Sequence, residues 1–328
     1  MPPPDARPAC TTLAMTRPPD HPAAPPRAQP KAPPKSNATS NTACPAEATG
    51  PAATLRQPQT QQPPPPDPWA ALRRHTNARI ALGRVGTSLP TAEVLRFGAA
   101  HAMARDAIHT PLDSAALAAS LQTDGWHTLD AHSQAPTRAD YLLRPDLGRR
   151  LSAASLHTLQ TLHLPAFDLL LVLGDVLSPV GIQRHALPLL HALRAQLSRL
   201  PSPRQPDGPL RLGPVVVARQ ARVALGDDIA QALHAPMVAV LIGERPGLSS
   251  PDSVGIYLTL HPQVGCHDAQ RNCISNVRPE RQDFATAARR FAWLVRQAHR
   301  LGTTGIHLKD ESDLETLEQA AGHAPMIC

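Results

Sequence analysis

Five short apolar runs in the second half of the chain constrain its fold more than any other feature. They are four to seven residues long and occupy residues 169–173, 215–218, 237–242, 254–260 and 305–308. Apolar runs of this length, without polar alternation, are typical of strands covered on both faces, as in a parallel sheet. We therefore expect all five segments to be strands of one sheet.

Helical stretches separate these runs. Residues 183–197 are expected to form one helix, and Asp227-Asp228 opens a second that stops before Pro236. Apolar residues between 284 and 298 recur at helical spacing and predict a third. Because strands and helices alternate, the expected fold is α/β, with a Rossmann-like, mostly parallel sheet flanked by helices.

The first 68 residues have a composition that cannot support a packed core. They hold 20 of the chain's 38 prolines and no Val, Ile, Phe, Tyr or Trp. Such a segment buries too little apolar surface to offset its conformational entropy. We expect residues 1–68 to be a disordered tail, either simply solvated or carrying a docking or encapsulation signal.

Residues 69–155 have a helical pattern. Pro90 and Thr91 give a start signal, with Thr91 as the candidate N-cap. Apolar residues then recur on one helical face: Val94, Leu95, Ala99, Ala102 and Met103. No strand is expected before residue 165, so this part is predicted to be a small all-helical domain. Residues 156–310 would form the Rossmann-like domain and residues 311–328 an acidic C-terminal tail.

Charge and side-chain spacing argue against several function classes. The net charge of +6 comes from arginines spread along the chain, so nucleic-acid binding is not expected. No apolar stretch approaches the ~20 residues of a membrane helix, and no signal core begins the chain, so we expect a cytoplasmic protein. The five cysteines and sixteen histidines show no disulfide or zinc-site spacing. Neither G-x-G-x-x-G nor a P-loop pattern occurs, which removes the main support for a nucleotide cofactor.

Two polar segments follow expected strands, where an open α/β sheet binds its ligand. GERPGLS (243–249) comes directly after the run at 237–242, and RNCISN (271–276) lies downstream of the run at 254–260. Other short motifs are TNARIALGR (76–84), YLLRPDLGRR (141–150), DVLS (175–178), RVALGD (222–227) and GIHLKDE (305–311). In this order they resemble the small (light) subunit of ethanolamine ammonia-lyase over roughly residues 70–310.

The resemblance implies an ammonia-lyase built from two kinds of subunit. That family's holoenzyme is a hetero-oligomer with several copies each of a large and a small subunit. It converts ethanolamine to acetaldehyde and ammonia by adenosylcobalamin radical chemistry. The large subunit's barrel holds the substrate, and the small subunit closes over the corrinoid from the other side. This chain would then contain no catalytic residue, and would lie in the cytoplasm or inside a bacterial microcompartment.

The resemblance also implies that cobalt keeps the dimethylbenzimidazole of the cofactor as its lower ligand. Cobalamin proteins that supply a histidine to cobalt carry the signature D-x-H-x-x-G. Here Asp130 and His132 begin that pattern, but position 135 is alanine. No metal ligand is therefore expected from this chain.

Three positions match the family's cofactor contacts. Glu244 could accept hydrogen bonds from the amide side chains around the corrin ring. Val223 could place its side chain against the benzimidazole, and Cys273 is small and soft enough to lie under a planar ligand. Structural roles remain open for each: an exposed acid paired with Arg245, a core valine and a buried structural thiol.

Three positions depart from the family pattern. Val176 and Ala221 stand where the family usually has glycine, and Gly98 stands where it usually has glutamine. An added side chain at a turn can forbid positive φ or close ligand approach. None of the three removes a matched contact residue. The alternative function is a diverged, non-catalytic assembly subunit of the same fold.

Overall fold

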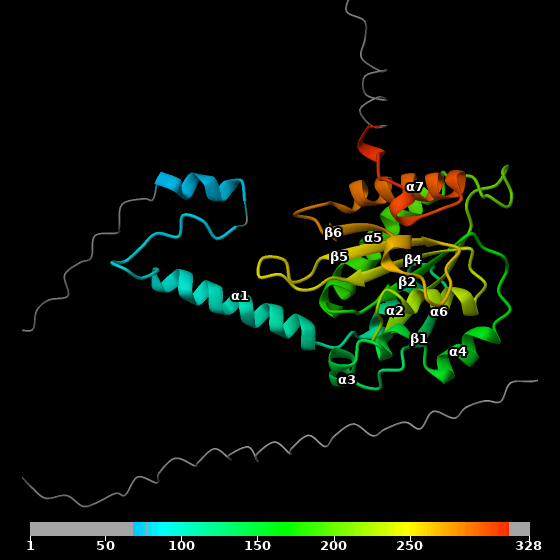
Figure 1. The fold of residues 1–328 in the computed structure, drawn as a ribbon, viewed down its shortest axis with the longest axis horizontal. Helices are drawn as coiled ribbons and strands as arrows, with labels where there is room; N and C mark the ends of the chain where they lie inside the picture. Colours follow the sequence, from blue (N-terminus) through cyan, green and yellow to red (C-terminus); the bar gives the residue numbers. More distant parts are fainter. Residues whose placement is uncertain (1–67, 77, 315–328) are drawn as a thin grey trace, which may run out of the picture. The chain divides into compact units, whose positions relative to one another are not determined.

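The computed structural model describes residues 68–76 and 78–314. Residues 1–67 of the expected N-terminal tail lie outside this range. So do residues 315–328 of the C-terminal tail expected at 311–328. The described part is α/β, with a six-stranded mixed sheet flanked by helices (Figure 1). The expected α/β class is confirmed.

The sheet has the strand order β1-β3-β2-β4-β5-β6. The strands are β1 (Thr128–His132), β2 (Leu169–Gly174), β3 (Leu212–Arg219), β4 (Met237–Gly243), β5 (Val254–Leu260) and β6 (Asn272–Val277). The first four strands in this order pair in parallel, whereas β5 is antiparallel to β4 and β6 is antiparallel to β5. Residues 244–253 join β4 to β5 without a crossover helix, and a short connection of this kind joins antiparallel neighbours.

Four of the five expected strands are correct, and the fifth is wrong. The runs at residues 169–173, 215–218, 237–242 and 254–260 are strands β2 to β5. The run at 305–308 contains a 3-10 turn, η4 (Gly305–His307), instead. Gly305 has a φ of 83°, and its N–H donates to Oδ1 of Asn272 rather than to a strand ladder. Apolar composition alone does not distinguish such a turn from a strand.

Two further strands are absent from the sequence-based prediction. β1 shows that the expectation of no strand before residue 165, and with it an all-helical segment over 69–155, is wrong. Both β1 and β6 lie at an edge of the sheet and pair with one neighbour only. Ala131 is the one buried residue of β1, and half of the residues of β6 are exposed. A strand with a solvent-facing side shows no continuous apolar run, so the pattern used here misses it.

Helices cover both faces of the sheet. α2 (Ser114–Thr123), α5 (Pro179–Leu197) and α7 (Phe284–Leu301) pack on one face, and α4 (Ala153–Gln160) and α6 (Leu225–Ala232) pack on the other. The helices expected at 183–197, from Asp227 and from residue 284 correspond to α5, α6 and α7. No helix in the described range is long and apolar enough to cross a membrane.

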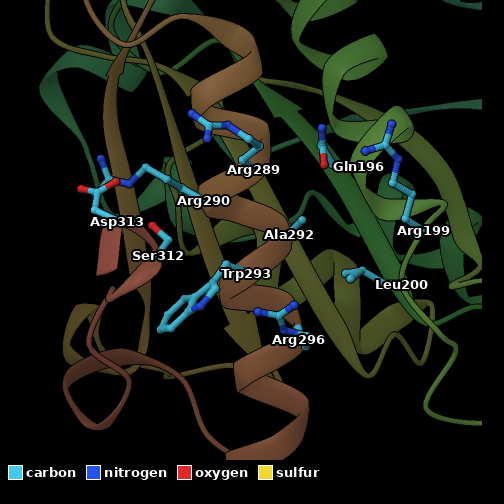
Figure 2. A pocket seen from close by; sticks show the side chains of 10 residues that line it. All are labelled: Gln196, Arg199, Leu200, Arg289, Arg290, Ala292, Trp293, Arg296, Ser312 and Asp313. Carbon is cyan, nitrogen blue, oxygen red and sulfur yellow. The ribbon is translucent and has the colours of Figure 1, made fainter. Parts of the chain in front are cut away.

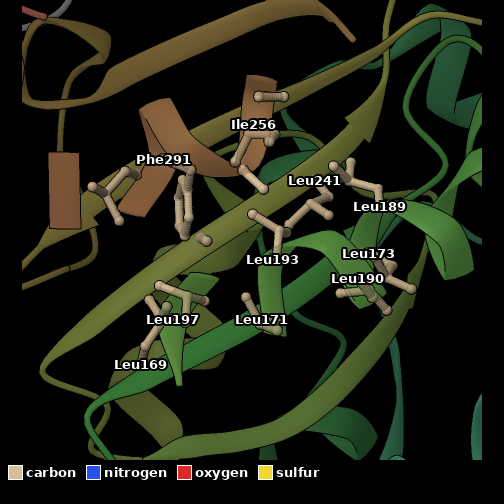
Figure 3. Close-up of a cluster of buried hydrophobic side chains, with 14 of the residues drawn as sticks. Leu169, Leu171, Leu173, Leu189, Leu190, Leu193, Leu197, Leu241, Ile256 and Phe291 are labelled. Atoms are coloured by element: carbon tan, nitrogen blue, oxygen red, sulfur yellow. The ribbon is translucent and has the colours of Figure 1, made fainter. Parts of the chain in front are cut away.

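Alternate residues of β2 point to opposite faces, as the strand period requires. Leu169, Leu171 and Leu173 join the cluster under α5 and α7, whereas Leu170 and Val172 join the cluster under α4 and α6. Figure 3 shows the first cluster, in which Leu193 of α5 and Phe291 of α7 lie among the leucines of β2. The core is thus split by the sheet into two layers.

Helix α1 (Thr91–His109) begins where the start signal places it. Thr91 is its first helical residue rather than its N-cap, which is Pro90 and makes no side-chain capping bond. The apolar face expected for this helix is largely exposed, with Leu95 67% and Met103 58% accessible. The remaining short elements are η1 (Pro68–Arg74), α3 (Arg138–Leu143), η2 (Leu147–Arg149) and η3 (Asp268–Gln270).

Candidate functional site

Glu244 is the first residue after β4 and is half-buried. Its backbone N–H donates to the carbonyl of Ser253, which continues the pairing with β5 by one residue. Its carboxylate accepts the backbone N–H of Asn276, with N–O distances of 3.0 and 3.2 Å to the two oxygens. In the described part of the chain Glu244 makes no ion pair with Arg245. The Glu244 side chain is therefore held by β6, two strands away from its own.

The Glu244 side chain lies across β5 because Gly255 leaves room for it. A Cβ atom at Gly255 would lie 2.9 Å from Oε1 of Glu244 and 3.3 Å from Cε2 of Tyr257. Gly255 and Tyr257 are two apart on one strand and so share a face. Glu244 and Tyr257 thus lie side by side on the β5 face opposite α5 and α7.

Cys273 of β6 pairs in register with Tyr257 of β5, so their side chains share this face. Burial raises the pKa of the Cys273 thiol, and the nearby Glu244 carboxylate adds to the rise. A hydrogen bond between the thiol and the Tyr257 hydroxyl opposes it. The residue keeps an exposed surface all the same. Burial likewise raises the pKa of the Tyr257 hydroxyl, with Cys273 and Glu244 adding to the shift. Both groups are therefore neutral at pH 7.

Glu244, Tyr257, Cys273 and Asn276 together form what we term the β5–β6 face. Helices α4 and α6 pack on this side of the sheet against β1 and β4, whereas Cys273 and Asn276 remain exposed. The structure thus brings two of the three predicted contact residues, Glu244 and Cys273, onto one exposed surface. Tyr257 and Asn276 complete it.

Val223 lies elsewhere, in the loop between β3 and α6. It is half-buried against the apolar cluster under α6, as the core-packing alternative requires. It also lines a hollow of about 450 Å³ with arginines from η2 and with Cys266, His267 and Asp268 of the β5–β6 connection. Glu244 lines a different hollow, together with Val176, Tyr257 and Asn276. The three predicted residues are therefore not in one pocket.

A buried ion pair connects the Val223 loop to the β5–β6 face. Arg271, directly before β6, donates to both carboxylate oxygens of Asp227 in the first turn of α6, at 2.8 and 2.6 Å. The two side chains are 1% and 2% exposed. Arg271 also donates to Oγ1 of Thr259 and to the carbonyl of Cys266. This network fixes the position of the first turn of α6 relative to the first residues of β6.

The loops after β2 and β3 each carry one departure from the family pattern, Val176 and Ala221, into the same region. Val176 has a φ of 32°, a left-handed backbone conformation that is unfavourable for a β-branched residue. Asp175 is buried, accepts the N–H of Ala221 at 2.9 Å and pairs with Arg138 at 3.4 Å. Burial raises the pKa of Asp175, and Arg138 and the Ala221 N–H oppose the rise. The loops after β2 and β3 are thus fixed to each other.

Tyr257, Asn276 and the Asp227–Arg271 pair were not among the residues predicted from the sequence. Asn276, Arg271 and Asp227 do stand inside the motifs at 271–276 and 222–227, so a signal existed for them. Tyr257 is the one polar-tipped aromatic in the apolar run of β5. Its place beside Cys273 follows from strand register, which the run does not reveal.

A separate cationic hollow lies on the opposite side of the sheet, between α5 and α7. Figure 2 shows its lining: Gln196, Arg199, Leu200, Arg289, Arg290, Ala292, Trp293, Arg296, Ser312 and Asp313. None of the predicted contact residues reaches it. Over the described residues no group of three or more His, Cys, Asp or Glu side chains is placed to hold a metal ion.

Fold and site together define an α/β protein that presents loops from the carboxyl ends of β3 and β4 beside the partly exposed β5–β6 face. Residues 66–309 match the family described as "Ethanolamine ammonia-lyase light chain (EutC)". The chain belongs to the ethanolamine ammonia-lyase light-chain family.

Curated relatives agree with this assignment. The ethanolamine ammonia-lyase small subunit of Pseudomonas fluorescens (strain Pf0-1) is 50% identical over 267 residues, which cover 80% of this chain and 94% of that protein. The small subunit of Pseudomonas syringae pv. tomato is 51% identical, with 77% and 87% covered. That of Azotobacter vinelandii is 49% identical, with 81% and 96% covered.

Proposed function

We propose that this chain is the small subunit of an adenosylcobalamin-dependent ethanolamine ammonia-lyase and forms part of the corrinoid site. Its family and the names of its relatives support the lyase assignment. The observation that carries the site is the β5–β6 face, where Glu244 and Cys273 meet on an exposed surface. The enzyme would convert ethanolamine to acetaldehyde and ammonia, with the substrate held by a large subunit.

The chemistry of the β5–β6 face fits a corrinoid. Amide side chains fringe the corrin ring and donate hydrogen bonds. A carboxylate can accept about four hydrogen bonds. Among the described residues, the Glu244 carboxylate accepts one donor, the backbone N–H of Asn276, so it has acceptor positions left for a ligand. The neutral thiol of Cys273 and the half-buried Tyr257 provide a small, weakly polar surface beside it. An acceptor beside a weakly polar patch suits a flat ring with donor groups at its rim.

Val223 would contribute from the other hollow. Its side chain is apolar and half-buried, and it closes one wall of a space that is otherwise lined mostly by polar residues. An apolar side chain in that position suits the benzimidazole end of the cofactor. Two separate hollows are compatible with one ligand because adenosylcobalamin combines a wide ring with a nucleotide arm.

The cofactor, when bound, supplies the radical that starts the reaction. The part of this chain is to bind, orient and shield. Glu244 accepts amide donors, Val223 contacts the apolar base, and the surface around Cys273 excludes water from one side of the ring. Cobalt would keep the cofactor's own base as its ligand. Substrate binding and the reacting groups belong to the large subunit, in a hetero-oligomer with several copies of each.

Three further points belong to the same proposal. The parallel part of the sheet, β1 to β4, would act as a Rossmann-like unit with its ligand loops at the carboxyl ends. Boundaries of the folded part near residues 68 and 310 belong to the proposal, whereas a boundary at residue 155 does not, because β1 pairs with β3 in the same sheet. The complex would lie in the cytoplasm, free or inside a bacterial microcompartment.

Co-expression with a barrel-forming large subunit encoded beside this chain tests the function. The complex should produce acetaldehyde from ethanolamine when adenosylcobalamin is added, and either subunit alone should not. Removing residues 1–66 should leave turnover within a few-fold. Ammonia release by this chain alone would overturn the subunit assignment. A complex that assembles but neither binds the cofactor nor turns over would indicate the diverged assembly subunit instead.

A further inference from the structure

The hollow around Val223 contains two arginines that have no carboxylate partner among the described residues. Three arginines line it: Arg149 and Arg150 from the end of η2, and Arg222 from the loop after β3. Arg150 is paired with Asp228 at 2.9 Å. Arg149 and Arg222 make no ion pair with any residue that the structure describes. These two guanidinium groups therefore carry uncompensated positive charge into the hollow.

The acidic groups of the hollow are already engaged. Asp228 also accepts the backbone N–H of Leu151, at 2.9 Å. Asp268 is paired with Arg271 at 3.6 Å and is otherwise exposed. The remaining titratable groups in the lining are Cys266 and His267. No carboxylate of the lining is thus left to neutralise Arg149 or Arg222.

Arg222 is held in place by Tyr141, from the long motif at 141–150. Its guanidinium lies 4.5 Å from the centre of the Tyr141 ring, which is fully buried. The Tyr141 hydroxyl donates to the carbonyl of Ala221 at 3.0 Å, next to Arg222 in the chain. Burial raises the pKa of Tyr141, so this hydroxyl stays a donor. The stacked ring fixes the arginine before any ligand arrives, which lowers the entropy lost on binding.

Gly148 brings the two arginines together. The backbone N–H of Arg222 donates to the backbone carbonyl of Gly148 at 2.8 Å. This bond joins the loop after β3 to η2, which contains Arg149. A Cβ atom at Gly148 would lie 2.7 Å from the Tyr141 ring and 3.0 Å from Cγ of Arg222. The Nε of Arg222 is buried and has no hydrogen-bond partner within the described residues. The motif at 141–150 therefore builds a fixed cationic wall beside Val223.

We propose that Arg222, assisted by Arg149, binds the phosphodiester in the nucleotide arm of adenosylcobalamin. The inference rests on the proposed function. It assigns residues to the phosphodiester, which Val223, Glu244 and Cys273 are not proposed to contact. Apart from this phosphodiester, the peripheral groups of the cofactor are neutral amides. Guanidinium groups match phosphate oxygens in geometry and charge. Val223, directly after Arg222, then faces the base that the phosphodiester carries.

Three corrinoids separate the phosphate contact from the rest of the binding energy. Adenosylcobalamin has ring, phosphate and base, adenosylcobinamide phosphate lacks the base, and adenosylcobinamide lacks both. The complex of both subunits is titrated with each corrinoid, and binding is followed by absorbance. Arg222→Met keeps an apolar stem beside Tyr141 and removes the charge. Arg199→Met, in the cationic hollow between α5 and α7, is the control for net charge.

Arg222→Met should weaken adenosylcobalamin and adenosylcobinamide phosphate about 10- to 100-fold, the size of a lost hydrogen bond to a charged group. Adenosylcobinamide should bind within about twofold of the parent complex, and Arg199→Met should change none of the three. Arg149→Met, an exposed change without packing consequences, should show the same selectivity with a smaller loss. Arg222→Lys should recover part of the affinity.

Equal weakening of all three corrinoids by Arg222→Met would make Arg222 a support for the loop and overturn the phosphate contact. If Arg222→Met fails to assemble, Arg149→Met decides, because an unselective or absent effect there refutes the inference. A parent complex that binds no corrinoid would instead refute the proposed function, so the two failures are distinguishable.

Discussion

Arg271 binds Asp227 with two hydrogen bonds in a site that solvent barely reaches. Arg271 is the first residue of the motif at 271–276, directly before β6, and Asp227 is the last residue of the motif at 222–227, in the first turn of α6. The pair therefore connects the loop of Val223 to the strand of Cys273. We expect the positions of Val223 and Cys273 relative to each other to depend on this pair.

Removing Arg271 should destabilise the chain strongly. Arg271→Met leaves the Asp227 carboxylate buried and unpaired, which typically costs about 3–5 kcal/mol. Urea unfolding of the full-length chain measures the loss. Asp268→Ala removes only the exposed partner of Arg271 and should leave the midpoint nearly unchanged. A small effect of Arg271→Met would mean that Asp227 reaches water or another cation.

Changing Glu244 should weaken cofactor binding in a graded way. Glu244→Gln keeps one carbonyl acceptor, whereas Glu244→Ala removes both acceptors and frees the Asn276 N–H. The Ala variant should raise the apparent adenosylcobalamin constant by roughly 10- to 150-fold, and more than Gln does. Arg245→Ala should weaken binding less than Glu244→Ala does, since Arg245 lines the same hollow but makes no ion pair with Glu244 among the described residues. Parent-like binding by both Glu244 variants would place this acid outside the site.

Gly255→Ala should disturb Glu244 without unfolding the sheet. The new Cβ would meet the flexible end of Glu244 first, so the carboxylate moves rather than the backbone. We expect weaker corrinoid binding with a nearly unchanged melting temperature. In the Glu244→Ala background Gly255→Ala should add little, because both changes act through the same group. Additive losses would show that Gly255 acts independently of Glu244.

Val176→Gly should cost less than its burial suggests. Val176 is 6% exposed, so losing its side chain removes apolar packing, but glycine also relieves the backbone at a φ of 32°. Left-handed backbone costs a non-glycine residue about 1–2 kcal/mol. Val216→Gly, in the same cluster and in ordinary strand conformation, should therefore be about 1–2 kcal/mol more destabilising. Equal losses in urea unfolding would contradict strain at Val176.

Gly98→Ala should stabilise the chain, whereas Gly226→Ala should destabilise it. Gly98 lies within α1 with open space where a Cβ would stand, and alanine in a helix interior gains about 1 kcal/mol over glycine. Gly226 lies in the first turn of α6 against Val240, and an added Cβ would overlap that side chain. Thermal melting shows whether each variant has a higher or a lower melting temperature than the parent chain. A neutral Gly98→Ala would indicate that a partner covers α1 closely.

The four central strands could be predicted because a strand that is buried on both faces has a continuous run of apolar residues. All residues of β2 and β4 are buried, so neither strand needs a polar side chain. β1 and β6 left no such trace, since each has one neighbour and a solvent-exposed side. The antiparallel ending of the sheet was equally hidden, because apolar composition does not encode strand direction.

For the candidate site, the motifs located the right segments but not the contacts between them. Glu244 and Cys273 could be selected from the sequence, yet their common face depends on the register of three strands. Arg271 and Asp227 are 44 residues apart, and no local spacing rule pairs them. The stacking of Arg222 on Tyr141 likewise joins residues from separate elements. Such partners are chosen by the tertiary structure.

The first turn of α6 is completed by residues far away in the chain. Asp227 pairs with Arg271, 44 positions downstream, and Asp228 pairs with Arg150, 78 positions upstream. Contacts of this sequence separation close long loops, which costs conformational entropy and slows folding. During synthesis, therefore, the loop of Val223 leaves the ribosome well before its geometry can be established. A chain interrupted ahead of residue 271 would contain Val223 and Glu244 but neither Arg271 nor Asn276, the partners that Asp227 and Glu244 have in the folded protein.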